Sequence, residues 1–285
     1  MLCNLWSEDG VQPATANPDG SAFTLLNPNL PLDLFCLSWS PDGARLLCHS
    51  GEGNPADAGL YTVRSSDAGD LVRVTATPPD GFDNGYGYSP DGSRILFARF
   101  DASDQGTLFS VKPDGSGSFR LSPPGLSIVD LGFFDRVGAD WSPDGSRVTF
   151  AARRKLSSRR PETAVFVVKE DATGLRQITP SGLGALSAQW SPNGHLIALT
   201  SCCGALQAWV VHPDGTALRE ATRPIDRAFS IAPVWSPDST RLLFNRVTRD
   251  GETSLWTAKT DGSGLSKLTD TGSLALYMWG TAPID

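Results

Sequence analysis

The sequence lacks the features that mark several large classes of protein. No apolar run of about 18 residues occurs in its 285 residues, so it predicts no membrane-spanning segment. The first ten residues lack the basic and apolar regions of a signal peptide, which leaves either a cytosolic protein or a missing leader. A net charge of −7 predicts no general affinity for nucleic acid, because such binding needs a basic face.

Patterns typical of catalysis and metal binding are also scarce. No Gly-x-Ser-x-Gly motif occurs, so the nucleophile elbow of an α/β-hydrolase is absent. The chain has only three His, and its five Cys show no metal-ligand spacing. Nucleophilic hydrolysis is therefore not predicted, and the Cys content does not decide the compartment.

The sequence contains instead a decamer that occurs five times. Its first copy is WSPDGARLLC, residues 39–48, and each copy begins with an aromatic residue. These markers are Trp39, Tyr88, Trp141, Trp190 and Trp235, with Trp279 as a degenerate sixth. They recur about every 44 to 53 residues, a period typical of propeller blades.

Each repeat predicts four antiparallel strands. A strand ends at the marker, Ser-Pro-Asp-Gly forms a tight turn, and a nearly continuously apolar strand follows. A variable loop then leads to a third strand, such as AVFVVKE. A second turn, clearest at Pro113-Asp114-Gly115, leads to a short fourth strand. This unit is typical of a β-propeller blade.

The two ends of the chain complete the count of predicted blades. Residues 1–27 predict the second, third and fourth strands of a blade that lacks its first, and residues 274–285 predict a first strand with nothing after it. Joining them makes one blade and leaves no sheet edge open. We therefore predict an all-β protein, a single six-bladed β-propeller domain over residues 1–285, with four antiparallel strands per blade and the last blade shared between the N- and C-termini.

The repeat resembles that of the TolB-like β-propellers. The resemblance is carried by the W-S-P-D-G-x-R unit with a following D-G-S-G and L-T, and it covers essentially the whole chain. It implies a propeller of WD-repeat-like SPDG units and a periplasmic or extracellular location. It implies no single function, because such propellers serve as protein-binding domains, as gating domains of prolyl-oligopeptidase-like enzymes, and as lyase or lactonase scaffolds.

Most of the repeated residues are predicted to be structural. The marker rings are expected to pack between blades. The turn carboxylates and the arginines that follow them are expected to pair at the rim. These are Asp42, Asp91, Asp144 and Asp238 with Arg45, Arg94, Arg147 and Arg241. A catalytic role repeated around a ring is not expected.

The variable loops of blade three carry the predicted binding site. Loops that vary are better placed for function than turns that repeat. The segment before the first strand, residues 123–140, is long and apolar, with Ile128 and Leu131 expected to be exposed, and the loop after the second strand is basic. The candidate partner-binding residues are Phe133, Phe134, Arg136, Arg153, Arg154, Lys155, Arg159 and Arg160. Such a patch suits an acidic peptide or a carboxylated ligand. The alternative is a solvated loop, with the Phe pair closing the channel mouth.

Carboxylates near the starts of the first strands are candidates for a metal site. Asp83, Asp135, Asp140 and Asp226 could converge on the channel and hold Ca²⁺, which takes six to eight oxygen ligands. They do not occupy one repeated position, and blades four and six offer no carboxylate there. The prediction is that no cofactor is needed, with Ca²⁺ in the channel as the alternative.

Two cysteines are expected to face each other in the first hairpin. Cys36 and Cys48 are equidistant from Asp42 at its centre, so their Cβ atoms are predicted to lie within bonding reach. A disulfide and a pair of buried thiols both remain open, and the thiols are favoured.

Taken together, the residues favour a non-catalytic, monomeric binding scaffold. It would present the loops of blade three to a protein or peptide, with neither nucleic acid nor membrane insertion as part of its function. The alternative is an enzyme, either a metal-dependent lyase or lactonase with a site at the channel mouth, or the propeller of a larger peptidase.

Overall fold

The computed structural model describes residues 2–7, 10–17, 21–26, 34–50, 55–129, 138–154, 162–202, 206–223 and 228–271. Regular structure in these ranges is almost entirely β-strand. The helical elements among them are two single 3₁₀ turns, η1 (Pro55–Asp57) and η3 (Ser181–Leu183). No helix in these ranges has the length and apolar character needed to cross a membrane. The described residues form two compact units, unit 1 up to Ser122 and unit 2 from Pro123 onwards.

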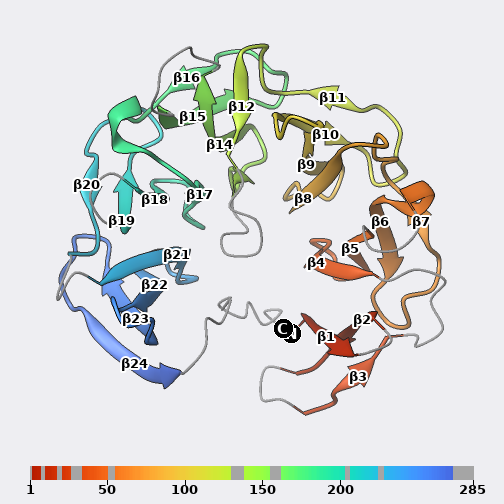
Figure 1. Cartoon of the computed structure of the whole chain (residues 1–285), viewed down its shortest axis with the longest axis horizontal. Coiled ribbons are helices and arrows are strands. Elements are labelled where there is room, and N and C mark those ends of the chain that lie inside the picture. The colour runs from red at the N-terminus through yellow and green to blue at the C-terminus, as the bar shows by residue number, and fades with distance from the viewer. Residues whose placement is uncertain are drawn as a thin grey trace. The chain divides into compact units, whose positions relative to one another are not determined.

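The strands of unit 1 that the structure describes fall into three antiparallel groups, which are called sheets below (Figure 1). The N-terminal sheet consists of β1 (Leu2–Ser7), β2 (Gly10–Thr15) and β3 (Thr24–Leu25). Sheet 1 consists of β4 (Phe35–Trp39), β5 (Arg45–Ser50), β6 (Gly59–Arg64) and β7 (Val72–Arg73). Sheet 2 consists of β8 (Phe82–Tyr88), β9 (Ile95–Phe100), β10 (Gly106–Val111) and β11 (Phe119–Arg120).

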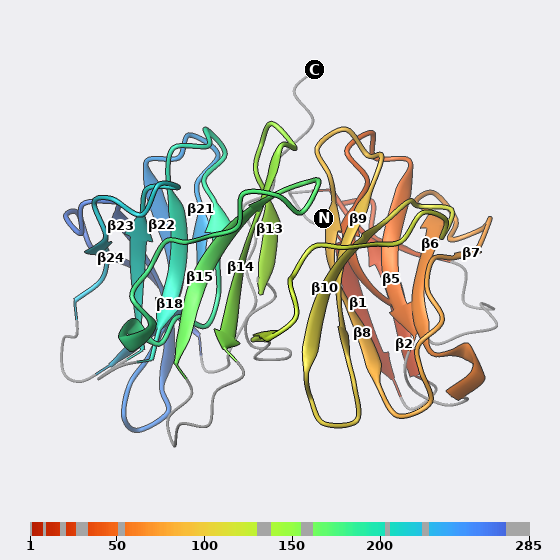
Figure 2. The same ribbon diagram turned by 90° about the horizontal axis from the view of Figure 1, so that it is seen from above.

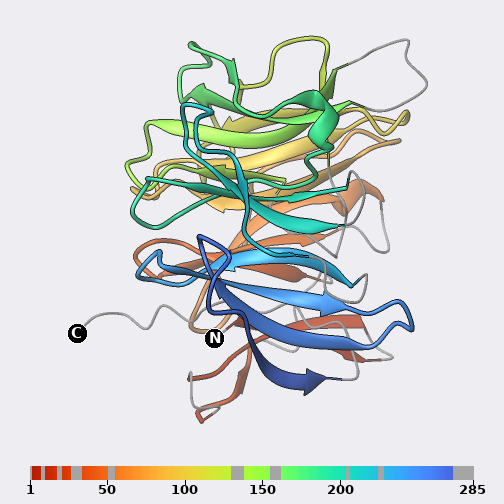
Figure 3. The ribbon, with the colours of Figure 1, turned by 90° about the vertical axis from the view of Figure 1, so that its left-hand side faces the viewer.

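Unit 2 also contains three sheets in the part of the chain that is described. Sheet 3 consists of β12 (Leu126–Ile128), β13 (Ala139–Trp141), β14 (Arg147–Arg154), β15 (Thr163–Lys169) and β16 (Arg176–Gln177). Sheet 4 consists of β17 (Gln189–Trp190), β18 (Ile197–Ser201), β19 (Gln207–Val211) and β20 (Arg219–Glu220). Sheet 5 consists of β21 (Phe229–Trp235), β22 (Arg241–Val247), β23 (Thr253–Lys259) and β24 (Ser266–Thr271). Figure 2 shows β14 beside β15, and Figure 3 shows sheet 5 in blue.

Each of sheets 1 to 5 contains the predicted hairpin. In sheet 2, Tyr88 pairs with Ile95 next to the turn, and Phe82 pairs with Phe100 at the far end. The turn closes because Gly92 adopts a left-handed conformation, with φ 72°. Sheets 1, 2, 4 and 5 have the four antiparallel strands predicted for a blade, and residues 1–27 form the three strands predicted for them.

The cores lie between consecutive sheets of the same unit. In unit 1, Leu47 of sheet 1 packs with Phe97 of sheet 2. In unit 2, Val165 of sheet 3 packs with Leu199 of sheet 4, and a similar core joins sheets 4 and 5. The second strands of sheets 1 and 4 contribute to a core on each of their two faces, which explains their nearly continuous apolar sequences.

The aromatic markers pack between sheets, as predicted. Trp190 lies in the core shared by sheets 3 and 4. Trp235 lies in the core shared by sheets 4 and 5, where its Nε1 donates a hydrogen bond to the carbonyl of Gln189 at 3.1 Å. Trp39 packs against the core between sheet 1 and the N-terminal sheet. Trp279 lies outside the described residues.

Candidate functional site

The repeated turn satisfies its own polar groups. The Ser40 hydroxyl donates to Asp42 Oδ1 at 2.6 Å and accepts from the backbone N–H of Arg45 at 2.9 Å. The same Asp42 oxygen accepts from the N–H of Ala44 at 3.0 Å. The hydrogen bond from Ser40 is the main reason that the pKa of Asp42 lies below its usual value. Asp42 is therefore an ionised turn residue whose oxygen is already engaged.

The other four turns repeat this arrangement. The pairs are Ser89 with Asp91, Ser142 with Asp144, Ser191 with Asn193, and Ser236 with Asp238. Hydrogen bonds from Ser142 and Ser146 lower the pKa of Asp144 to about 2. Because one geometry recurs in each of sheets 1 to 5, the interpretation of these carboxylates as structural is confirmed.

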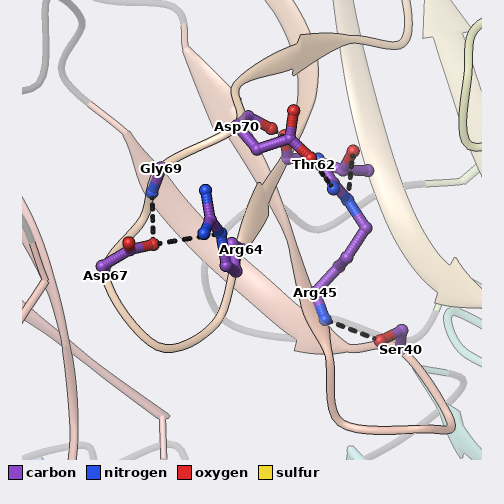
Figure 4. A network of polar contacts seen from close by, with 7 residues as sticks. All are labelled: Ser40, Arg45, Thr62, Arg64, Asp67, Gly69 and Asp70. Carbon is purple, nitrogen blue, oxygen red and sulfur yellow. Dashed lines mark hydrogen bonds and ion pairs between the residues drawn. The ribbon is translucent and has the colours of Figure 1, made fainter.

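The arginine after the turn binds elsewhere than predicted. Figure 4 shows Arg45 reaching across sheet 1, where Nε donates to Thr62 Oγ1 at 3.1 Å and Nη1 pairs with Asp70 at 2.6 Å. Asp67 nearby pairs with Arg64 at 3.4 Å. The predicted pairing of Arg45 with Asp42 is wrong. The long side chain extends across the sheet, away from the first turn, to the third strand and the turn that follows that strand.

Two further arginines make the same contact. Arg94 donates to Ser110 Oγ at 2.9 Å, and Arg241 donates to Thr257 Oγ1 at 3.0 Å. Their predicted pairings with Asp91 and Asp238 are therefore also wrong.

Arg147 differs because sheet 3 has an apolar residue, Val167, where the others have a hydroxyl. Its guanidinium lies instead over the ring of Trp190 in sheet 4, 4.9 Å from the centroid, and it makes a small contribution to the lowered pKa of Asp144.

Sheet 3 is built differently from the other sheets at its loop end. Two short strands pair in succession with one edge of β14. β13 pairs next to the turn, and β12 pairs with the last residues, so that Ser127 lies opposite Arg153 and Leu126 opposite Arg154. Arg154 is exposed, its guanidinium lies 6.0 Å from the centroid of Phe166, and it donates to Gln177 at 3.4 Å. Arg153 and Arg154 thus end the longest strand described, and as successive residues of a strand they direct their side chains to opposite faces of sheet 3.

The other predicted binding residues are not described. Phe133, Phe134, Arg136, Lys155, Arg159 and Arg160 all lie outside the described residues, as does Leu131. The prediction that Ile128 is exposed is wrong. Ile128 is only 2% exposed, because it lies in β12 opposite Ala152 of β14.

The two described metal candidates are engaged by protein groups. Both carboxylate oxygens of Asp83 accept from Arg99, each at 2.7 Å. Asp140 accepts from the backbone N–H of Trp190 at 2.9 Å, and burial raises the pKa of Asp140 to about 7. Asp135 and Asp226 lie outside the described residues. Within the described ranges, no group of three or more His, Cys, Asp or Glu side chains could hold a metal ion, and Ca²⁺ stays a prediction.

Two arginines missed by the sequence analysis hold the connections between sheets. Arg99 pairs with Asp83 and also donates to the carbonyl of Ala76, in the connection from sheet 1 to sheet 2, at 3.0 Å. Arg246 donates to the carbonyl of Arg223, in the connection from sheet 4 to sheet 5, at 3.1 Å. Each lies the same number of residues after the repeat arginine of its sheet. This shared spacing in the sequence could have identified both residues.

Exposed phenylalanine side chains lie beside these connections between sheets. Phe82 begins β8, is 48% exposed and stacks on Phe100 with 4.5 Å between centroids. Phe229 begins β21 at the equivalent place and is 38% exposed. Both strands begin at the end opposite the repeated turns. Exposed aromatic residues on anchored backbone are typical of binding surfaces.

The predicted cysteine pair is close enough to bond. Cys36 lies directly opposite Cys48 across β4 and β5, and the structure joins them in a disulfide. The alternative of two buried thiols, which the sequence favoured, is not the state in the structure.

Comparison with known proteins identifies the fold. No protein-family model matches the chain. A protein named TolB homolog from Chlorobium luteolum is 25% identical over 200 residues, which cover 70% of this chain and 39% of that protein. The match thus spans less than half the length of that relative.

Solved structures give the same result. TolB from Acinetobacter baumannii superposes with a TM-score of 0.61 at 18% identity, covering 88% of this chain and 58% of that one. Puromycin hydrolase gives 0.63 at 17% identity, covering 94% and 44%. An oligogalacturonate lyase in complex with manganese gives 0.63 at 13% identity, covering 94% and 72%. Similarities at these identities establish fold alone. The chain has a TolB-like β-propeller fold.

Proposed function

We propose that the chain is a non-catalytic binding propeller that presents the loop end of sheet 3 to a protein or peptide. The proposal includes a single six-bladed domain over residues 1–285, with a closing blade made from residues 1–27 and 274–285. The three-stranded N-terminal sheet supports this closure, because β1 is its edge strand among the described residues and a first strand would pair there.

The construction of sheet 3 is the observation that carries the proposed site. In sheets 1, 2 and 5 one strand pairs along the second strand, and in sheet 4 β17 is supplemented by a single bridge between Ala185 and Ser201, whereas β14 is paired by two strands, β12 and then β13. Residues 129–138 connect those two strands in the sequence. This connection contains Phe133, Phe134 and Arg136, so we propose that apolar and basic residues of the connection act together with Arg153 and Arg154.

The charge of this region indicates the chemistry of the partner. Arg153, Arg154, Lys155, Arg159 and Arg160 occur within eight residues of a chain whose net charge is −7. Guanidinium groups bind carboxylates in a bidentate manner, and rings beside them favour apolar side chains. We therefore propose an acidic peptide segment with apolar residues as the ligand, bound more weakly as salt rises.

Synthetic peptides test this proposal. Two sets of immobilised peptides, one acidic and one with the same apolar residues but neutral, are probed with the protein. The variant Arg153→Glu/Arg154→Glu should bind acidic peptides at least roughly tenfold more weakly and melt within about 2 °C of the wild type, because surface charges contribute little to stability. Arg176→Glu, an exposed charge reversal on β16 of the same sheet, is the control and should bind normally. Equal binding by wild type and double variant would contradict the site.

An enzymatic role is the second candidate, and the similarity to a lyase solved with manganese supports it. In this case Asp83, Asp135, Asp140 and Asp226 would supply oxygen ligands at the channel mouth. Metal analysis of the purified protein discriminates between the two. A stoichiometric metal that is lost in Asp140→Asn would favour the enzyme. A metal-free protein whose melting temperature does not change when a chelator is added would favour the binding propeller.

A further inference from the structure

The disulfide of sheet 1 is enclosed by the N-terminal sheet. Cys36 and Cys48 are both 0% exposed. They belong to a core that also contains Leu26, which follows β3, and against which Leu2 of β1 packs. The core around the two cysteines therefore includes apolar side chains from β1 and from just after β3, the two outer strands of the N-terminal sheet.

One side chain fastens this cover to the backbone of a bonded cysteine. Asn4 of β1 donates from Nδ2 to the carbonyl of Cys36, and its Oδ1 accepts from the N–H of Cys36, both at 2.8 Å. The side-chain amide of Asn4 thus pairs with the backbone of Cys36 in the way that the backbone of a neighbouring strand would. β1 and β2 both contact β4, so the N-terminal sheet is docked directly over the strand that carries Cys36.

We propose that the N-terminal sheet is a redox-protecting cover, which docks over the Cys36–Cys48 disulfide after the bond has formed and must open before it can be reduced. Thiol–disulfide exchange requires a thiolate to reach a sulfur atom, and the docked sheet excludes it. The bond would thus be made while the N-terminal sheet is still undocked, by exchange with a disulfide-bearing oxidant of the kind found in oxidising compartments.

Once the cover is open, the disulfide is reduced by ordinary thiol–disulfide exchange. One thiolate of a dithiol such as dithiothreitol attacks a sulfur of the pair, the Cys36–Cys48 bond breaks, and a mixed disulfide forms. The second thiol of the reductant then displaces the cysteine. Two electrons and two protons end on the two cysteines, and the reductant leaves as a cyclic disulfide. The rate depends on access to the sulfurs, so it reports how often the cover opens.

Reduction kinetics of the whole native chain test the proposal. The protein is treated with dithiothreitol, quenched with an alkylating reagent at intervals, and digested, so that mass spectrometry follows Cys36 and Cys48 individually. The wild type should be reduced at least about 100-fold more slowly when native than in urea. Asn4→Ala removes two hydrogen bonds from the docked state and should accelerate native reduction roughly tenfold.

A matched control separates docking from general instability. Asn17 lies in the connection from β2 to β3 of the same sheet and donates to Ser21 Oγ at 3.0 Å, a bond within the sheet itself. Asn17→Ala should leave the reduction rate unchanged. Three results would overturn the proposal: unreduced protein in which both cysteines are alkylated, wild type reduced as fast when native as in urea, or equal acceleration by Asn4→Ala and Asn17→Ala. Should Asn4→Ala fail to fold, Asn4→Asp, which keeps the acceptor but loses the donor, takes its place with a smaller acceleration expected.

Discussion

The second turn of sheet 3 offers a direct test of backbone strain. Ala172 has φ 62°, in the left-handed region, whereas the same position is glycine in sheets 2, 4 and 5 (Gly115, Gly215 and Gly262). A residue with a Cβ loses roughly 1–2 kcal/mol in this conformation, and glycine loses about 0.5–1 kcal/mol through its freer unfolded chain. Ala172→Gly should therefore stabilise the protein by about 0.5–1 kcal/mol.

Two reverse substitutions complete the test. Gly174, in the same turn, has φ 66°, and an added Cβ would meet only side-chain carbons of Lys169 at 3.6 Å or more. Gly174→Ala should therefore cost about 1 kcal/mol through its backbone alone. Gly115 has φ 82°, and an added Cβ would lie 2.9 Å from the carbonyl oxygen of Val74. Gly115→Ala should cost clearly more, because backbone must move as well.

Urea unfolding followed by fluorescence, with calorimetry for the melting temperature, measures all three variants. We expect Ala172→Gly to melt about 2 °C higher, Gly174→Ala about 2 °C lower and Gly115→Ala lower still. Destabilisation by Ala172→Gly, or a Gly115→Ala variant as stable as Gly174→Ala, would refute the reasoning from φ and Cβ contact.

Three further predictions concern buried and titrating groups. Thr179→Val should lower the free energy of unfolding by about 1–3 kcal/mol in urea titrations, because the buried N–H of Val165 loses its acceptor at 2.9 Å; a loss below roughly 0.5 kcal/mol would contradict this. Asp140→Asn should gain stability relative to wild type between about pH 4 and pH 7. The folded pKa of Asp140, about 7, lies above the unfolded value near 3.9, so the wild type loses stability as pH rises across this window and loses no more above it; parallel pH curves would count against the assignment. Asp144 has the opposite sign: its pKa near 2 means that its contribution is present above about pH 4 and is lost as pH falls toward 2, so Asp144→Ala should flatten the acid limb of the stability curve.

The elements that the sequence predicted well are local. The Ser40–Asp42 turn closes within six residues, and its hydrogen bonds need no other part of the chain. The apolar second strands and the marker rings follow from a pattern that repeats, so each copy supports the others. The opposition of Cys36 and Cys48 was predicted from their equal distances to Asp42, but it arises through a register shift between Cys36 and Ser38, because Trp39 pairs with Leu46 next to the turn.

The contacts that escaped prediction join residues that are distant in sequence. The partner of Arg45 is Asp70, beyond the third strand, and the nearer carboxylate of Asp42 is already held by the turn. Asp83 has both oxygens on Arg99, and this pairing depends on the register of β8 against β9. The burial of Ile128 depends on β12 pairing with β14, which no feature of its own segment indicates.

The sequence by itself determined the repeat, the hairpins and the all-β class, because strand periodicity and turn chemistry are properties of neighbouring residues. Only the tertiary structure decided which charged groups meet, which loops are anchored and where the N-terminal sheet docks on Cys36. The physical reason is that a long side chain such as Arg45 or Arg99 can reach several polar groups at different distances along the sequence, and the packing of the sheets decides which of them come within hydrogen-bonding distance.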